Sequence, residues 1–194
     1  VGAERGWVFI RHEYEPERLR LAEAIEQARA AGALGSNIFG SRFSFDIEIF
    51  VSPGGYILGE ETALLECIEG FRGEPRNKPP FPGTQGLHGR PTLINNVETF
   101  LHAAGILKNG IEWWRSLGAK GFAGHKFISV SGDVARPGVQ LVPRGTTLRA
   151  LLSRCGGMRA GQGLAAIAPG GASRNFLSPD HPHLPPRFET PPHA

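Results

Sequence analysis

The stretch PGGYILGEETALLECIEGFRGEPRNKPPFPGTQGLHGRPTLINNVET, residues 53–99, decides the fold of this chain. It opens on a glycine turn at 53–55, and its apolar spacing predicts a helix that starts near Gly59 or Glu60 and runs through Glu69. Glycine reaches backbone conformations that other residues avoid, and a helix start presents free N–H groups. Ligands of open α/β sheets bind where a strand end meets such a turn and helix.

The residues before this stretch predict the rest of an α/β unit. Residues 7–10 form a short β-branched and aromatic run that is typical of a buried strand. Residues 17–31 have a helical apolar period that ends at Gly32, and residues 45–50 alternate like a second strand. Strand, helix and strand in this order indicate the βαβ unit of an open α/β sheet.

The second half of the stretch predicts a long loop and a third helix. Residues 71–92 contain five prolines and no apolar period, and irregular loops of this length in compact domains are more often functional than idle. The third helix is predicted to start at Asn95, because Asn95 and Glu98 have the spacing of a capping box, and to end near Asn109.

The C-terminal part of the sequence predicts a second, smaller domain with the strand–strand–helix–strand order of a β-grasp module. The predicted elements are strands at 126–132 and 139–142, a helix at 148–155 capped by Thr146 or Thr147, and a strand at 164–168. We expect an α/β domain at 1–122, a β-grasp domain at 123–177 and an unstructured proline-rich tail at 178–194.

Composition excludes several classes of protein. The chain has 194 residues and a net charge of +3, and its basic residues are scattered among acids, so we expect no nucleic-acid partner. Cys67 and Cys155 are too few for a disulfide framework or a self-contained iron–sulfur site, and they suit a reducing compartment. Three histidines of the tail could bind a metal, but a solvated tail is favoured, and we predict no metal site.

The sequence also bears on membrane insertion, on a signal peptide and on the extent of the chain. No run of 18 apolar residues and no basic-then-apolar leader is present, so we expect no membrane span and no signal peptide. The first residue is Val1, and the last dozen residues read as an unfinished loop. We therefore expect this chain to be part of a longer polypeptide.

The polar residues of the stretch have both a functional and a structural interpretation. Glu60 and Glu61 either complement the helix dipole or accept hydrogen bonds from two ligands on opposite sides of the helix start. Lys78 and Phe81 lie on a stiff polyproline segment that could hold a nucleotide by charge and stacking, or could be a plain surface loop. The adjacent amides of Asn95 and Asn96, as a pair, could bind a phosphate or polyol, or cap a helix. Without a GxGxxG or GxxxxGK[ST] motif, the residues alone predict no more than a candidate nucleotide site.

Four separated motifs in the same order resemble one known family. They are FIRHEYEPE with AIEQARAAGALGSNIFGS and FDIEIF; GGYILGEETALLECIEGFRGEPRNKPPFP; GRPTLINNVET; and KFISVSGDVARPG with GTTLRALL and AIAPGGAS. This set resembles the NADH- and FMN-binding flavoprotein subunit of respiratory complex I (the F subunit of NADH-quinone oxidoreductase) and the diaphorase subunits of NAD-linked hydrogenases and formate dehydrogenases. The resemblance covers residues 5–177.

The resemblance implies a Rossmann-like FMN- and NADH-binding domain, present in part, followed by a ubiquitin-like, soluble-ligand-binding β-grasp domain. By position, the flavin would contact Gly55, Tyr56, Gly59 and Glu60, with Asn95 and Asn96 at its ribityl phosphate. Glu61 would contact the ribose or nicotinamide end of NADH, as the catalytic residue of the set. Lys78 and Phe81 would hold the nucleotide.

The implied activity is that of an NADH dehydrogenase subunit: hydride transfer from NADH to FMN, then electron transfer to an iron–sulfur cluster. Implied partners are the other subunits of a complex I-like, hydrogenase or formate dehydrogenase assembly, including a thioredoxin-like 2Fe–2S subunit. The expected location is cytoplasmic, at the cytoplasmic face of the inner membrane. The alternative is a non-catalytic remnant, or an assembly or ligand-binding scaffold.

The sequence departs from the family pattern in several places. Leu58 stands where the family commonly has Cys, and Ser52-Pro53 stands where Gly-Ala is usual. The family's upstream glycine-rich loop and its downstream cysteine set for a 4Fe–4S cluster are absent from these residues, so that cluster is expected only outside this chain.

Overall fold

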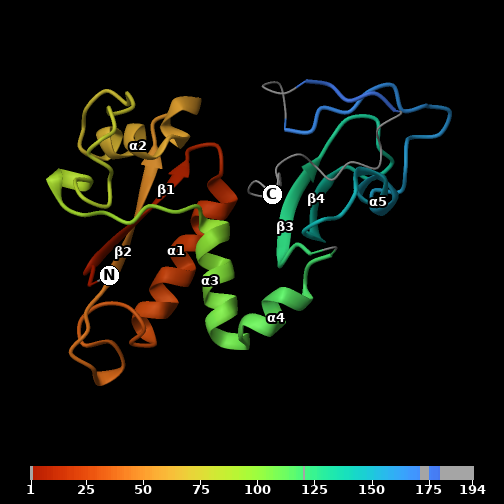
Figure 1. The fold of residues 1–194 in the computed structure, drawn as a ribbon. Coiled ribbons are helices and arrows are strands. Elements are labelled where there is room, and N and C mark those ends of the chain that lie inside the picture. The colour runs from red at the N-terminus through yellow and green to blue at the C-terminus, as the bar shows by residue number, and fades with distance from the viewer. Residues whose placement is uncertain (1, 120, 171–174, 180–194) are drawn as a thin grey trace. The chain divides into compact units, whose positions relative to one another are not determined.

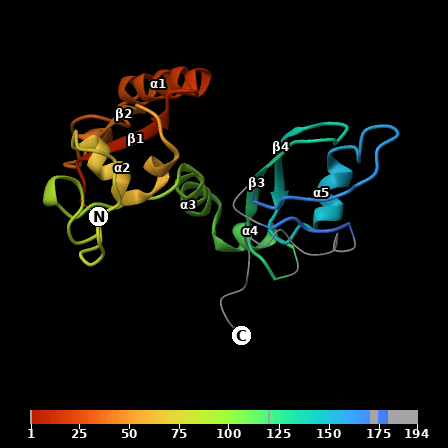
Figure 2. The same cartoon turned by 90° about the horizontal axis from the view of Figure 1, so that it is seen from above.

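A computed structural model describes residues 2–119, 121–170 and 175–179 of the chain. The chain divides into two compact units, one up to Asn95 and one from Asn96 onward (Figures 1 and 2). The division falls between the two asparagines of the NNVET motif. The predicted domains at 1–122 and 123–177 therefore remain predictions, and each unit is described by itself below.

The first unit contains the predicted βαβ motif. Strand β1 spans Arg5–Arg11, helix α1 spans Glu15–Ala30, and strand β2 spans Asp46–Ser52. The two strands are parallel, and the cross-strand partners Phe9 and Phe50 stack with ring centroids 5.4 Å apart. Helix α1 is tied to β2 by Arg29, which donates to Asp46 Oδ1 at 3.0 Å and to the carbonyl of Ile47 at 3.0 Å. The parallel βαβ prediction is confirmed.

The connection from α1 to β2 is a hydrogen-bonded loop. It contains the short 3₁₀ helix η1, Ile38–Gly40, and closes with an antiparallel bridge between Gly35 and Phe45. Phe39 has a left-handed backbone with φ of 50°, which is uncommon for a bulky residue.

Beyond β2 the chain turns through the 3₁₀ helix η2, Tyr56–Gly59, into helix α2, Glu61–Ile68. Figure 1 shows both strands pointing toward the α2 end of the unit. The predicted helix is confirmed, but its predicted inward residues (Ala63, Leu64, Cys67 and Ile68) are only partly right. Ala63 and the unpredicted Leu65 are buried at 0% and 1% exposure, while the other three are half-buried.

Residues 71–92 are irregular as predicted, apart from the 3₁₀ helix η3, Leu87–Gly89. The loop is closed by main-chain hydrogen bonds: Thr92 N donates to Pro82 O, and Gly86 N donates to Arg90 O, both at 2.8 Å. Gly86 lies at this closure with no room for a side chain, because an added Cβ would lie 2.4 Å from Thr92 Cβ and 2.9 Å from Pro82 O.

The second unit begins with helices α3, Val97–Asn109, and α4, Ile111–Ser116. The cap of α3 is Asn96, whose side chain accepts a hydrogen bond from Glu98 N at 2.8 Å. The prediction that Asn95 caps this helix is therefore wrong. A capping side chain can accept a hydrogen bond from the main-chain N–H either two or three residues ahead. Asn96 accepts from the N–H two residues ahead, so the helix starts one residue later than predicted.

The remaining elements of the second unit form a hairpin and a helix. Strands β3, His125–Val130, and β4, Gly138–Pro143, pair antiparallel, and helix α5 spans Leu148–Arg154. Thr147 caps α5 by accepting from Ala150 N at 3.3 Å. The buried apolar residues here are Val134, Val142, Leu148, Leu151 and Cys155. The hairpin and the capped helix are confirmed.

The predicted strand at 164–168 is wrong. Within the described residues this segment forms only one isolated bridge, between Ile167 and Leu177. Alanine occupies three of its five positions, and alanine has few side-chain atoms to pack on a sheet. Residues 180–194 of the predicted tail, with its three histidines, lie outside the described residues.

Replacing Gly86 by alanine should destabilise the first unit. The added methyl group would clash with Thr92 Cβ and the main chain of Pro82, and overpacking of this kind costs about 1–3 kcal/mol. Urea unfolding followed by circular dichroism checks this. Gly83→Ala is the matched control, because a Cβ at Gly83 meets no atom within 4 Å. Equal effects of the two substitutions would contradict the packing.

Candidate functional site

The first turn of α2 is organised by Glu60. Its Oε2 accepts hydrogen bonds from Thr62 N and Ala63 N, both at 2.8 Å, and from Thr62 Oγ1 at 2.5 Å. A side chain in this position satisfies main-chain donors that the helix itself leaves free. Thr62 is 1% exposed, so this part of the network is shielded from water. Glu60 is therefore the N-cap of α2, a role that was not predicted for it, and its other oxygen remains for a second contact.

Lys78 joins the two glutamates. Its Nζ lies 3.1 Å from Glu60 Oε1 and 2.6 Å from Glu61 Oε1. The expectation that the two carboxylates face opposite sides of the helix start is therefore wrong, since both reach one ammonium group. The loop at 71–92 brings Lys78 back to the start of α2, 17 residues after Glu61. We call Glu60, Glu61 and Lys78 the carboxylate–lysine cluster.

Contacts within the cluster shift the pKa values of Glu60 and Lys78 toward their charged forms. Burial of Glu60 raises the pKa of its carboxyl, but hydrogen bonds from Thr62, Ala63 and Lys78 together outweigh burial and lower this pKa to about 2. The pKa of Lys78 is raised, first by its hydrogen bond to Glu61 and then by that to Glu60. Glu60 thus stays an acceptor and cannot serve as a general acid near pH 7.

Glu61 keeps more capacity for a ligand than Glu60. Glu60 uses one oxygen for three donors and the other for Lys78. Glu61 places one oxygen on Lys78, and its side chain remains 41% exposed. A carboxylate can accept about four hydrogen bonds. The arrangement thus leaves Glu61 able to accept from hydroxyl or amide groups.

The glycine turn before α2 exposes its backbone and one aromatic ring. Gly54 and Gly55 have positive φ values of 116° and 102°, and a Cβ on Gly59 would meet no atom within 4 Å. Tyr56 is 92% exposed, whereas Leu58 points inward and is 6% exposed. The turn thus offers an open face on which a flat ligand could rest.

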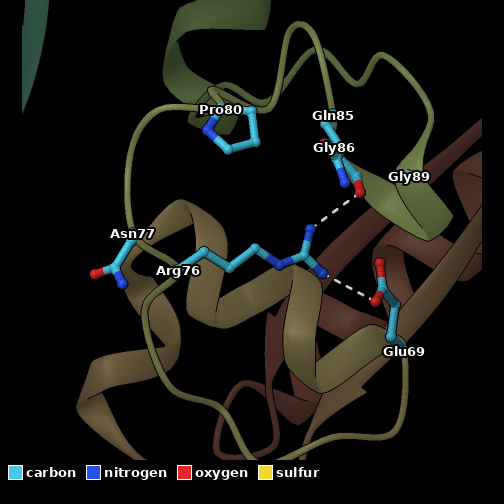
Figure 3. A pocket seen from close by; sticks show the side chains of 7 residues that line it. All are labelled: Glu69, Arg76, Asn77, Pro80, Gln85, Gly86 and Gly89. Atoms are coloured by element: carbon cyan, nitrogen blue, oxygen red, sulfur yellow. Dashed lines mark hydrogen bonds and ion pairs between the residues drawn. The ribbon is translucent and has the colours of Figure 1, made fainter.

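The loop that carries Lys78 is held to α2 by Arg76. Its guanidinium contacts Glu66 Oε1 at 2.5 Å, Glu69 Oε2 at 2.9 Å and Gly86 O at 3.0 Å. Beside it lies a polar cavity of about 200 Å³, which Figure 3 shows with the Arg76 side chain reaching across it. Phe81, further along the loop, is 59% exposed.

The structure brings together some of the predicted site residues and not others. Glu60, Glu61 and Lys78 are in direct contact, and Gly55, Tyr56 and Gly59 lie on the turn that leads into them. Asn95 ends the first unit, while Asn96 begins the second and is engaged as a helix cap. Sequence reasoning missed Thr62 and Arg76. The Arg76 contacts had one available signal, the acids Glu66 and Glu69 on one side of the predicted helix.

The described residues contain neither a helix that could cross a membrane nor a group of side chains that could hold a metal ion. Among them, each helix is too short or too polar to cross a bilayer. The part of the chain that the structure describes also contains no group of three His, Cys, Asp or Glu side chains that could hold a metal ion.

Replacing Glu60 by glutamine should destabilise the chain at neutral pH but not in acid. The pKa of Glu60 in the folded chain is about 2, against an ordinary 4.5, so its charge stabilises the fold fully above pH 4.5. That contribution is lost as the pH falls toward 2. We expect a loss of about 1–2 kcal/mol at pH 7, from weaker charge-assisted hydrogen bonds.

Urea unfolding between pH 7 and pH 2 measures this difference. Glu74→Gln is the control, since the Glu74 side chain is 66% exposed and pairs only with the exposed Arg72. A Glu60→Gln effect that is independent of pH would show that the carboxylate charge does not stabilise the helix start.

Two domain families and several known proteins are similar to this chain. Residues 1–104 match the Nuo51 FMN-binding domain, and residues 127–176 match the SLBB domain. The chain is 46% identical over 189 residues to the F subunit of NADH-quinone oxidoreductase from Salmonella typhimurium, which covers 97% of this chain and 42% of that protein. It is 43% identical over 179 residues to the NADP-reducing hydrogenase subunit HndC of Solidesulfovibrio fructosivorans, covering 92% and 36%.

A solved structure is also similar. A chain of an NAD⁺-reducing NiFe hydrogenase in the air-oxidized state superposes with a TM-score of 0.82 at 35% identity, covering 95% of this chain and 30% of that one. This chain therefore spans less than half the length of the relatives it matches. Because the first match covers more than half of its residues, the chain belongs to the Nuo51 FMN-binding domain family, with NADH-quinone oxidoreductase F subunits among its relatives.

Proposed function

We propose that this chain forms one wall of an NADH-oxidising flavin site, as part of an NADH dehydrogenase flavoprotein subunit. The observation that carries the proposal is the carboxylate–lysine cluster at the end of an open glycine turn. Two fixed carboxylates beside an exposed backbone suit a ligand that is flat and rich in hydroxyl and amide donors. FMN and NADH both have this chemistry.

The residues present fit FMN at its ring and polyol. The turn at 54–59 has two positive-φ glycines and an open face at Gly59, so a planar ring can approach its main chain. FMN, when bound, supplies the redox chemistry: it accepts a hydride from NADH and passes electrons singly to an iron–sulfur cluster, which we place outside this chain. Tyr56 and Gly59 would line it, and Gly55 would allow the close approach.

Glu61 would orient the nicotinamide end of NADH. Its partly exposed carboxylate can accept hydrogen bonds from ribose hydroxyls or from the carboxamide, and Lys78 holds it in place. Glu60, already engaged in capping, would fix the helix start and accept at most one further donor. These residues position reactants rather than move protons, in line with catalysis by proximity and orientation.

Lys78 and Phe81 would bind the nucleotide, Phe81 by stacking and Lys78 by its charge. The exposed ring of Phe81 is available for stacking on an adenine. Lys78 is paired with two carboxylates, so a phosphate would have to share its ammonium group with Glu60 and Glu61. Asn95 and Asn96 are proposed at the ribityl phosphate, where the Asn96 amide nitrogen could donate while its oxygen caps α3.

The proposal extends to the architecture and the assembly. We propose that residues 1–122 are part of a Rossmann-like FMN- and NADH-binding domain, and that residues 123–177 are a β-grasp domain. The partners would be other subunits of a complex I-like or hydrogenase assembly, at the cytoplasmic face of the membrane. The similarity to subunits of both kinds of enzyme supports this placement.

A second candidate function is a non-catalytic scaffold for assembly or ligand binding. The observation that favours it is the pairing of Lys78 with two glutamates, which competes with a phosphate for its ammonium group. The two candidates differ in one result. The enzyme, expressed with its flanking coding sequence and supplied with FMN, should become yellow and reduce ferricyanide with NADH. A colourless product without this activity would contradict the enzyme and support the scaffold function.

Glu61→Gln should impair NADH oxidation while FMN stays bound. Loss of the carboxylate weakens hydrogen bonds to NADH, and a lost charge-assisted hydrogen bond costs about 1.5–3 kcal/mol, which is roughly a 10- to 100-fold fall in kcat/KM. The measurements are steady-state NADH–ferricyanide kinetics and flavin content by absorbance. Glu112→Gln is the control, since Glu112 lies on α4 with a 79% exposed side chain. A loss of FMN, with the KM for NADH and the rate per bound flavin unchanged, would reverse the assignments of Glu60 and Glu61.

A further inference from the structure

Arg76 is fixed through both its side chain and its main chain. Its guanidinium contacts Glu66 and Glu69 on α2 and the carbonyl of Gly86 across the loop. Its main-chain N–H donates to Thr62 Oγ1 at 2.9 Å. The Arg76 side chain is 24% exposed, and those of Glu66 and Glu69 are 24% and 11% exposed. These pairs are therefore better shielded than a typical surface ion pair.

Other contacts hold the far end of the loop, where Leu87 is buried and His88 N donates to Glu69 Oε1 at 2.7 Å. The space between Arg76, Pro80 and the 85–89 segment is a cavity of about 200 Å³ rather than packed side chains (Figure 3). Its lining is largely polar (Glu69, Asn77, Gln85 and glycines). Directional contacts of the Arg76 guanidinium and amide therefore align the loop beside this cavity.

Arg76 is connected to the carboxylate–lysine cluster in two ways. Thr62 Oγ1, which accepts from Arg76 N, donates in turn to Glu60 Oε2 at 2.5 Å. Along the chain, Lys78 follows only two residues later, so its Cα can lie at most about 7 Å from that of Arg76. A pinned Arg76 therefore confines the main chain from which the Lys78 side chain extends.

We propose that Arg76 is a positioning residue that places Lys78 between Glu60 and Glu61. It acts by clamping the loop to both ends of α2: the Glu66 and Glu69 carboxylates near the C-terminal end and Thr62 near the start. Arg76 also compensates two acids in the last turns of a helix, where negative charge is unfavourable. The bearing of this clamp on NADH rests on the proposed function, whereas the placement of Lys78 does not.

Arg76→Met in the full 194-residue chain tests the clamp without any cofactor. The readout is the acetylation rate of Lys78 relative to Lys108 under limiting N-hydroxysuccinimide acetate, by peptide mass spectrometry. Lys108 is exposed on α3 and serves as the internal reference. Pairing with Glu61 and Glu60 raises the pKa of Lys78 and slows this reaction. We expect the Lys78 to Lys108 ratio to rise roughly three- to tenfold in Arg76→Met.

Matched variants separate positioning from general loss of structure. Arg72→Met removes an exposed pair with Glu74 in the same loop and should leave the ratio unchanged. Glu69→Gln removes one guanidinium partner and should raise the ratio less than Arg76→Met does; it keeps the proposal testable if Arg76→Met fails to fold. Arg76→Lys keeps the charge without the fork and should be intermediate.

A double-mutant cycle supplies the outcome that overturns the proposal. In a Glu60→Gln, Glu61→Gln background, Lys78 has lost its ionic partners, so adding Arg76→Met should change its reactivity little. An unchanged ratio in Arg76→Met alone, or an equal rise in both backgrounds, would contradict positioning through these carboxylates. In the reconstituted enzyme, a raised Lys78 reactivity with an unchanged KM for NADH would uphold the clamp and contradict the proposed role of Lys78 in nucleotide binding.

Discussion

The contact of one lysine with two adjacent carboxylates is the interaction on which the candidate site depends. Lys78 meets Glu60 and Glu61 at the first turn of α2, and Glu60 uses its other oxygen to cap that helix. The glycine turn, the helix start and the loop at 71–92 are thereby linked through a few polar groups. A change at any one of these groups should alter the others, because hydrogen bonds and ion pairs join them in one network.

These polar contacts explain how the loop at 71–92, about twenty residues long, can be held in one position beside the candidate site. Closing such a loop is entropically costly, and an unrestrained loop would not hold a lysine in one place. Main-chain hydrogen bonds at Gly86 and Thr92 close one end, and the Arg76 guanidinium ties the other to α2. The glycine turn that precedes α2 has an open side, because a Cβ on Gly59 would meet no atom within 4 Å.

Much of this structure is predictable from local sequence. The βαβ order, the start of α2, the hairpin and the cap of α5 follow from apolar period, glycine and capping chemistry. The cap of α3 is Asn96 rather than Asn95, and local sequence separates them poorly because two adjacent amides give nearly the same signal. The meeting of Glu60, Glu61 and Lys78 is not predictable, since it depends on the path of an aperiodic loop. The contacts of Arg76 escape prediction for the same reason: its partners are 7 to 10 residues away in sequence but across the loop in space.

We propose that the turn at 54–60 and the carboxylate–lysine cluster form one wall of a flavin–nicotinamide site. An experimental structure of the complete assembly with FMN and NADH bound would test this placement most directly. We expect the flavin ring against the main chain of Gly55 to Gly59, with the nicotinamide ribose or carboxamide within hydrogen-bond distance of Glu61. A flavin bound away from this turn, with Glu61 contacting only Lys78, would contradict it.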